Sequence, residues 1–171
     1  MKWLVRGAVG FLSLIGGAVL VLLAMGARGD KKLQSAIEIA KPPEVVRTWL
    51  TEPEKLKAWV GWLVEVRREG DREIWVVEDR NNGNARMEIV AYDMREEPGR
   101  LFAKLKVDGS FHGWNEYRLT DLGGRTRLEM SGEYEYEHWF AKLLEPIITR
   151  EATKKQDEDL ARLKGLVEAK S

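Results

Sequence analysis

The sequence predicts an α+β domain in which one long C-terminal helix lies across a curved antiparallel sheet. Most of residues 33–136 alternate between apolar and polar side chains in short segments separated by turns, the pattern of antiparallel strands. Apolar residues in the last third recur at spacings of three, four and seven, the stripe of an amphipathic helix over residues 138–170. This stripe, which we expect to pack against a core, consists of Trp139, Phe140, Leu143, Leu144, Ile147, Ile148, Leu160, Leu163 and Val167.

An uncharged run at residues 7–27 precedes this domain. Its 21 residues reach about 30 Å as a helix, the thickness of one hydrocarbon layer. We therefore assign residues 1–30 to a transmembrane helix with a short linker and residues 31–171 to the folded domain, and expect a single-pass membrane protein. A cleaved signal peptide is the alternative, with Ala24 and Gly26 at the cleavage site, although signal cores are usually only about 7–15 residues long. Basic residues are balanced at the two ends of the run, which leaves the side of the membrane open.

The first strand and two short helices open the domain. Residues 33–39 alternate, with Leu33, Ser35, Ile37 and Ile39 on the buried face. Two prolines, at positions 42 and 43, end this strand and favour the first turn of a helix over residues 44–50. A Thr-x-x-Glu capping box at residues 51–54 predicts a second short helix that ends near residue 59.

Six further strands follow, joined by hairpins. Their predicted turns contain the glycines of residues 69–71, 81–83, 97–99, 108–109 and 122–124. In the strand near residue 89 we expect Met87, Ile89 and Ala91 to face inward. In the last helix an interior proline removes a backbone hydrogen bond, so we expect a kink or restart between Lys142 and Pro146.

Composition excludes several functions. The formal net charge is zero, which gives no electrostatic case for nucleic acid as a partner. There are no cysteines and only two histidines, so thiolate chemistry is excluded and no motif indicates a metal or another cofactor.

The predicted order of one strand, two short helices, six strands and one long helix is that of the helix-grip fold. The chain resembles the START/Bet v 1-like (SRPBCC) superfamily, in particular the polyketide cyclase/dehydrase-like proteins. The resemblance covers about residues 33–170. It implies a seven-stranded antiparallel curved sheet and a ligand pocket between this sheet and the helix. The segments that carry it are residues 37–46, Trp49-Leu50, Pro53, residues 113–119, 124–128, 139–146 and 159–164.

We expect a small apolar or amphipathic molecule in this pocket. The residues predicted to line it are Met87, Ile89, Leu105, Gly113, Asn115, Tyr117, Met130, Tyr134, Phe140 and Ile147. Asn115, Tyr117 and Tyr134 place polar groups on the inward face, where each bonds another core group or meets a ligand. Gly113 lies mid-strand either because the backbone bends there or because a ligand needs the space, and we favour space.

Candidates for catalysis are few. Glu78 is a candidate acid if its strand turns Ile74 and Val76 inward, but it faces outward if Trp75 and Val77 are the inward pair. Alternation turns His112 outward, and His138 is a helix-entry residue. The sequence therefore predicts a membrane-anchored binding module. The alternatives are a cyclase or dehydratase that uses the same pocket, with Tyr117, Tyr134 or Glu78 as acid or base, and a protein-interaction module of the chaperone-activator type, whose pocket is filled by side chains.

Overall fold

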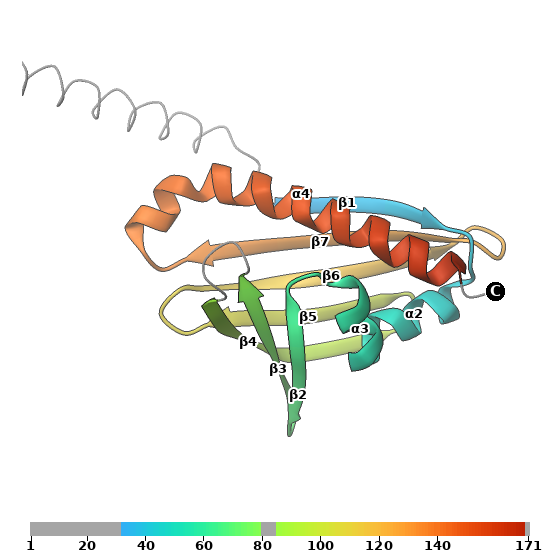
Figure 1. Ribbon diagram of the computed structural model, residues 1–171, viewed down its shortest axis with the longest axis horizontal. Helices are drawn as coiled ribbons and strands as arrows, with labels where there is room; N and C mark the ends of the chain where they lie inside the picture. Colours follow the sequence, from blue (N-terminus) through green and yellow to red (C-terminus); the bar gives the residue numbers. More distant parts are fainter. Residues whose placement is uncertain (1–31, 80–84, 170–171) are drawn as a thin grey trace, which may run out of the picture.

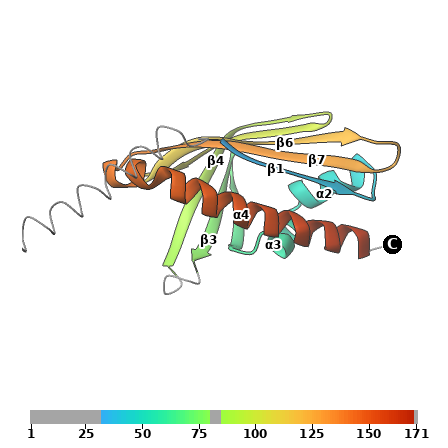
Figure 2. The same ribbon diagram turned by 90° about the horizontal axis from the view of Figure 1, so that it is seen from above.

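A computed structural model describes residues 32–79 and 85–169 of the chain. Within these residues, seven strands form one antiparallel sheet in the order β1-β7-β6-β5-β4-β3-β2. All three described helices lie on the same side of this sheet, and β2 and β3 curve toward them (Figure 2). The strands are β1 (Lys32–Ile39), β2 (Leu63–Glu69), β3 (Arg72–Asp79), β4 (Ala85–Glu97), β5 (Arg100–Val107), β6 (Phe111–Asp121) and β7 (Thr126–Tyr136), and the helices are α2 (Pro43–Thr51), α3 (Pro53–Trp59) and α4 (Trp139–Ala169).

This architecture confirms the predicted α+β class with a seven-stranded sheet, two short helices after the first strand and a long C-terminal helix. The predicted transmembrane helix and the turn at residues 81–83 lie outside the described residues. Within residues 32–79 and 85–169, no helix is both long enough and apolar enough to cross a membrane.

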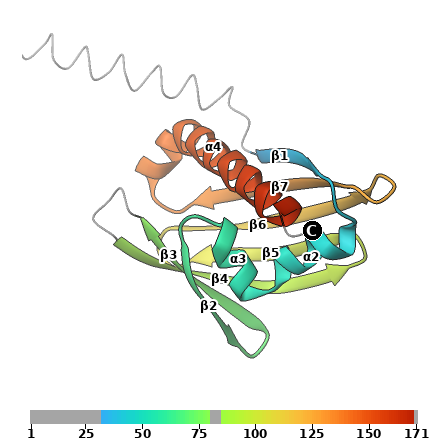
Figure 3. The same cartoon turned by 45° about the vertical axis from the view of Figure 1, so that its right-hand side comes forward.

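The helices divide the inner face of the sheet between them. In Figure 3, α4 lies over β1 and β7, whereas α2 and α3 lie over the half of the sheet that contains β5 and β4. Apolar side chains meet between these layers. The core includes Ile39, Val46, Trp59, Leu128, Leu160 and Leu163, each no more than 2 % exposed.

The predicted capping box does not form. Thr51 is the last residue of α2, and its hydroxyl donates to the Arg47 carbonyl instead of capping α3. Glu52 is the N-cap of α3, and its extended backbone is the conformation that a following proline favours. Pro53 therefore sets the start of α3, and the Thr-x-x-Glu pattern is incidental.

The sequence predicts a kink or a restart near Pro146, and because α4 runs unbroken through this proline, the restart does not occur. The first turns of α4 nevertheless run in a different direction from the rest, as Figure 1 shows, and the proline supplies a cause for this bend. In Figure 1 these first turns lie beyond the end of β7. The apolar stripe is consequently not buried there: Trp139 is 76 % exposed, and the first buried residue of α4 is Thr149.

Hydrogen bonds to main-chain atoms attach the last turns of α4 to β1. The Lys164 ammonium donates to the Glu38 carbonyl at 2.8 Å, and the Ala40 amide donates to the Glu168 carboxylate at 2.7 Å. Because β1 is an edge strand, α4 covers one border of the sheet.

Strand β4 extends to Glu97, where the sequence predicts the next turn. A bulge between Tyr92 and Arg95 shifts its register with β5, and Asp93 takes a φ of 49°. The bulge interrupts the period of two in the second half of the strand.

Candidate ligand-binding cavity

A cavity of about 250 Å³ lies between the inner face of the sheet, α3 and α4. Its walls are mostly apolar. Lys155 of α4 is exposed and also lines the cavity, so the cavity reaches the surface beside this helix, where the Lys155 ammonium lies 5.9 Å from the ring centre of Trp62. The lining side chains are Leu33, Leu56, Trp59, Val60, Trp62, Leu63, Trp75, Ile89, Leu105, Phe111, Asn115, Tyr117, Met130, Tyr134, Tyr136, Ala152, Lys155, Gln156 and Asp159.

The structure brings six of the ten predicted pocket residues together around this cavity. All six lie on strands β4 to β7, where the alternation of inward and outward side chains placed them correctly on the inner face. They are Ile89, Leu105, Asn115, Tyr117, Met130 and Tyr134.

Three predicted residues do not line the cavity. Met87 is 39 % exposed near the start of β4, and Phe140 and Ile147 are 56 % and 44 % exposed in the first half of α4. The prediction for Phe140 and Ile147 fails because the apolar stripe of α4 continues into its first turns, which do not lie over the cavity.

Gly113 also does not line this cavity, and the reason we favoured for it is wrong. A side chain there would clash with the Glu133 carbonyl oxygen and lie 2.7 Å from Cδ1 of Tyr134. The close approach of β7 therefore requires glycine, and space for a ligand does not.

Sequence reasoning missed the polar residues that α4 contributes to the cavity. Gln156 and Asp159 are buried on the same helical stripe as Leu160 and Leu163. The spacing of three and four that identified the leucines also includes these two residues, and this signal could have found them.

The Asp159 carboxylate connects α4 to the segment between α3 and β2. It accepts hydrogen bonds from the Gly61 amide at 3.1 Å and from Nη1 of Arg162 at 2.7 Å. The same guanidinium donates to the Trp59 carbonyl at 2.6 Å. These hydrogen bonds join α3, α4 and the segment between α3 and β2, and all three contribute residues to the cavity wall.

Asn115 and Tyr134 bond each other, which is one of the two roles we considered for these residues, and both also line the cavity. The Tyr134 hydroxyl donates to Oδ1 of Asn115 at 2.6 Å. Burial raises the pKa of Tyr134 to about 12, although this hydrogen bond partly opposes the shift. Burial also raises the pKa of Tyr117, with further contributions from Tyr134 and Asp159. Both phenols therefore keep their protons at neutral pH.

The inward carboxylate of β3 is Glu73, and Glu78 faces the opposite side. Trp75 and Val77 are the inward pair, so Glu78 pairs with Arg86 at 3.2 Å on the outer face, which contradicts its role as a candidate acid. Glu73 is buried and accepts hydrogen bonds from Arg68 at 2.6 Å and from the Trp75 indole at 3.1 Å.

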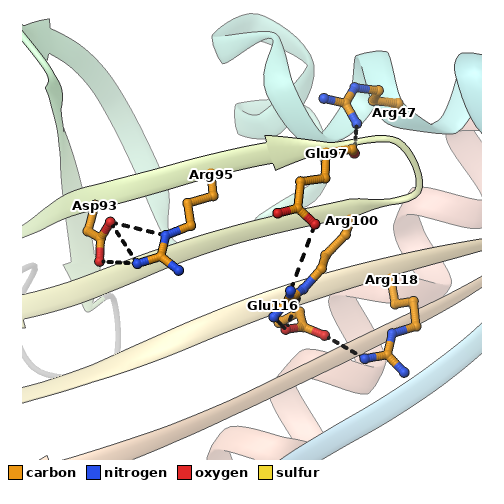
Figure 4. Close-up of polar contacts among 7 residues, drawn as sticks. All are labelled: Arg47, Asp93, Arg95, Glu97, Arg100, Glu116 and Arg118. Carbon is orange, nitrogen blue, oxygen red and sulfur yellow. Dashed lines mark hydrogen bonds and ion pairs between the residues drawn. The ribbon is translucent and has the colours of Figure 1, made fainter.

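The outer face carries a network of charged residues (Figure 4). Glu116 is buried there because Arg100 and Arg118 both bind its carboxylate. Burial alone would raise the pKa of Glu116, but these hydrogen bonds outweigh it and the pKa is lowered. Arg47 of α2 donates to the Glu97 carbonyl at 2.9 Å, which ties this helix to the turn between β4 and β5.

The two histidines lie away from the cavity. His112 faces outward as predicted, with Nε2 3.4 Å from the Glu135 carboxylate. His138 is exposed directly before α4. In the part of the chain that the structure describes, no group of three His, Asp or Glu side chains is placed to hold a metal ion.

Comparison with known proteins identifies the family. Residues 30–168 match the family described as polyketide cyclase / dehydrase and lipid transport, so the chain belongs to this family. This membership suggests ligand binding or a cyclase-like function. A search of curated proteins gave no match.

Solved structures share the fold. A START superfamily protein from Mycobacterium smegmatis aligns with a TM-score of 0.65 at 17 % identity, over 82 % of this chain and 99 % of its own. A protein from Thermus thermophilus gives 0.65 at 21 % identity, over 82 % and 99 %. A conserved protein from Geobacillus kaustophilus gives 0.67 at 12 % identity, over 80 % and 94 %. At these identities the similarity establishes the fold alone.

Proposed function

We propose that this protein is a membrane-anchored binding module that holds a small apolar or amphipathic molecule between its sheet and α4. The observation that carries this proposal is the cavity of about 250 Å³ with mostly apolar walls. An apolar protein cavity of about 150 Å³ binds benzene, so this one has room for about ten non-hydrogen atoms. Ligand pockets are typically apolar with a few polar groups, as here.

The empty volume of the cavity and the raised pKa values of its tyrosines favour ligand binding over the interaction module and the enzyme. An interaction module of the chaperone-activator type would have its interior filled by side chains, whereas this interior is partly empty. A cyclase or dehydratase needs an acid or base with a pKa near neutral pH. The pKa values of Tyr117 and Tyr134 are raised away from that range, and Asp159 is already engaged by Arg162.

The membrane part of the proposal rests on the uncharged run at residues 7–27. Fractionation of cells that express the full-length protein tests it. We expect intact chain in the membrane fraction, and extraction by detergent but not by salt. Soluble protein whose first residue lies near Ala27 would instead establish a cleaved signal peptide.

Ligand binding is tested by filling the cavity. Ala152 of α4 lines it, so Ala152→Phe places a ring in the space, whereas Ala161→Phe adds the same ring on the exposed side of the same helix. Full-length protein and both variants are titrated with tetralin in one detergent, which makes partition into micelles equal for all three. We expect Ala152→Phe to abolish binding and Ala161→Phe to retain it. Equal binding by both variants would contradict the proposal.

A further inference from the structure

Two hydrogen-bond donors stand side by side on the inner face of β6. Asn115 and Tyr117 are two residues apart on this strand, both are buried, and both line the cavity. The bond from Tyr134 occupies Oδ1 of Asn115 and leaves its amide nitrogen as a donor. Among the described residues, none accepts a hydrogen bond from this nitrogen or from the Tyr117 hydroxyl.

Neither donor is sealed off from the cavity, because among the described residues the fully buried side-chain polar atom without a partner is Oγ of Ser35. An unmade hydrogen bond at a buried polar group costs about 1–3 kcal/mol, so such groups normally have a partner. Here the donors border the empty space, and the rest of the wall near them is largely apolar, with Trp75, Ile89 and Leu105. A ligand that fills the cavity excludes water from these donors, so it must itself supply an acceptor to avoid this cost.

The charge of the wall limits what this acceptor can be. The Asp159 carboxylate lines the same cavity, and its charge contributes to the raised pKa of Tyr117. A second negative charge beside the Tyr117 hydroxyl would be repelled by Asp159. A neutral oxygen with two lone pairs accepts from both donors without this repulsion.

We propose that the molecule held in this cavity carries a neutral carbonyl oxygen, as in a ketone, ester or amide, which accepts hydrogen bonds from the Tyr117 hydroxyl and the Asn115 amide. This inference rests on the proposed function and names the chemical class of its ligand. The apolar part of the molecule then lies against the aromatic and aliphatic wall.

A matched pair of ligands and a matched pair of variants test the inference. Tetralin and 1-tetralone share two fused rings and differ by one ketone. Tyr117→Phe removes the donor hydroxyl and breaks no hydrogen bond with a described residue, so the variant should fold. Tyr92→Phe is the control, since Tyr92 lies on β4 and does not line the cavity. Dissociation constants are measured by calorimetry on the full-length protein in one detergent.

We expect the dissociation constant of 1-tetralone to rise about fivefold to tenfold in Tyr117→Phe, the ratio for one neutral hydrogen bond. The constant for tetralin should change less than twofold, and Tyr92→Phe should leave both constants unchanged. Unchanged 1-tetralone binding in Tyr117→Phe, or an equal loss for both ligands, would overturn the carbonyl inference while cavity binding stands. If neither ligand binds the unmodified protein, both the carbonyl inference and the proposed function are wrong.

Discussion

The Tyr134 hydroxyl on β7 donates a hydrogen bond of 2.6 Å to Oδ1 of Asn115 on β6, and the residue paired with Asn115 across the two strands is Gly132. A side chain at Gly132 would clash with this oxygen, so the glycine provides the room in which the amide lies. One polar pair on the inner face thus depends on the absence of a third side chain.

Removal of the Tyr134 hydroxyl tests the value of this pair. Tyr134→Phe leaves Oδ1 of Asn115 buried without its donor, which should lower the free energy of unfolding by about 1–3 kcal/mol. Urea denaturation measures the change. Tyr136→Phe, on the same strand but half-buried, should cost clearly less, and equal costs would show that the bond to Asn115 contributes nothing specific.

Glycine at position 113 should be required for stability. Gly113→Leu forces the new side chain against the backbone of β7, and overpacking of this kind costs about 1–3 kcal/mol. Gly165→Ala is the control, because a side chain there meets open space within α4 and should raise the unfolding free energy by about 0.5–1 kcal/mol. A Gly113→Leu variant as stable as the unmodified protein would restore the interpretation that this position leaves space for a ligand.

Stability should fall above pH 10. An unfolded tyrosine titrates near pH 10, whereas burial raises the pKa of Tyr134 to about 12. Between these two values the unfolded chain loses the proton and the folded chain keeps it, so the stabilising contribution is complete below pH 10 and is lost as the pH rises through the folded pKa. For this one residue the loss is about 3 kcal/mol.

Unfolding free energies at pH 8 and pH 11 measure about half of this loss, about 1.4 kcal/mol, because pH 11 lies midway between the two pKa values. Tyr117→Phe should flatten the dependence because burial raises the pKa of Tyr117 too. A Tyr117→Phe variant with an unchanged pH dependence would show that this phenol does not titrate differently in the folded and unfolded chains.

The attachment of α4 through Asp159 should contribute to stability as well. Asp159→Ala leaves the Gly61 amide and Arg162 without this acceptor and should cost about 1.5–3 kcal/mol, the range for hydrogen bonds to charged groups. Asp157→Ala is the matched control, since Asp157 is exposed on the same helix and its loss should change stability by less than about 0.5 kcal/mol. Thermal unfolding followed by circular dichroism compares the two variants, and equal midpoints would contradict the role of Asp159.

The fold could be predicted from the sequence because its signals are local. Turns such as Asp108-Gly109 and the period-two alternation of β6 and β7 mark each hairpin, and successive hairpins specify the order of the sheet. The capping-box prediction failed because Pro53 is a second local signal in the same segment, and this proline sets the start of α3.

The cavity could be predicted only in part. Strand alternation identified inward residues such as Asn115 and Tyr117, because the two faces of a strand follow directly from position. It could not say which inward residues border empty space. Gly113 shows this limit, since a glycine in mid-strand does not reveal whether a close backbone or a ligand requires it. The helix stripe, in turn, could not show where α4 leaves the sheet, and the exposure of Phe140 is the result.

The two borders of the sheet are protected by different means. An unpaired edge strand can recruit the same strand from another copy and start self-association. Along β1 the side chains of Lys164 and Glu168 already hold main-chain groups near the strand end, so the last turns of α4 act against such pairing. The opposite border, β2, carries Glu65, Arg67, Arg68 and Glu69, whose charges must lose water before another strand can pair. A chain shortened before Lys164 would therefore lose protection at one border and associate through β1.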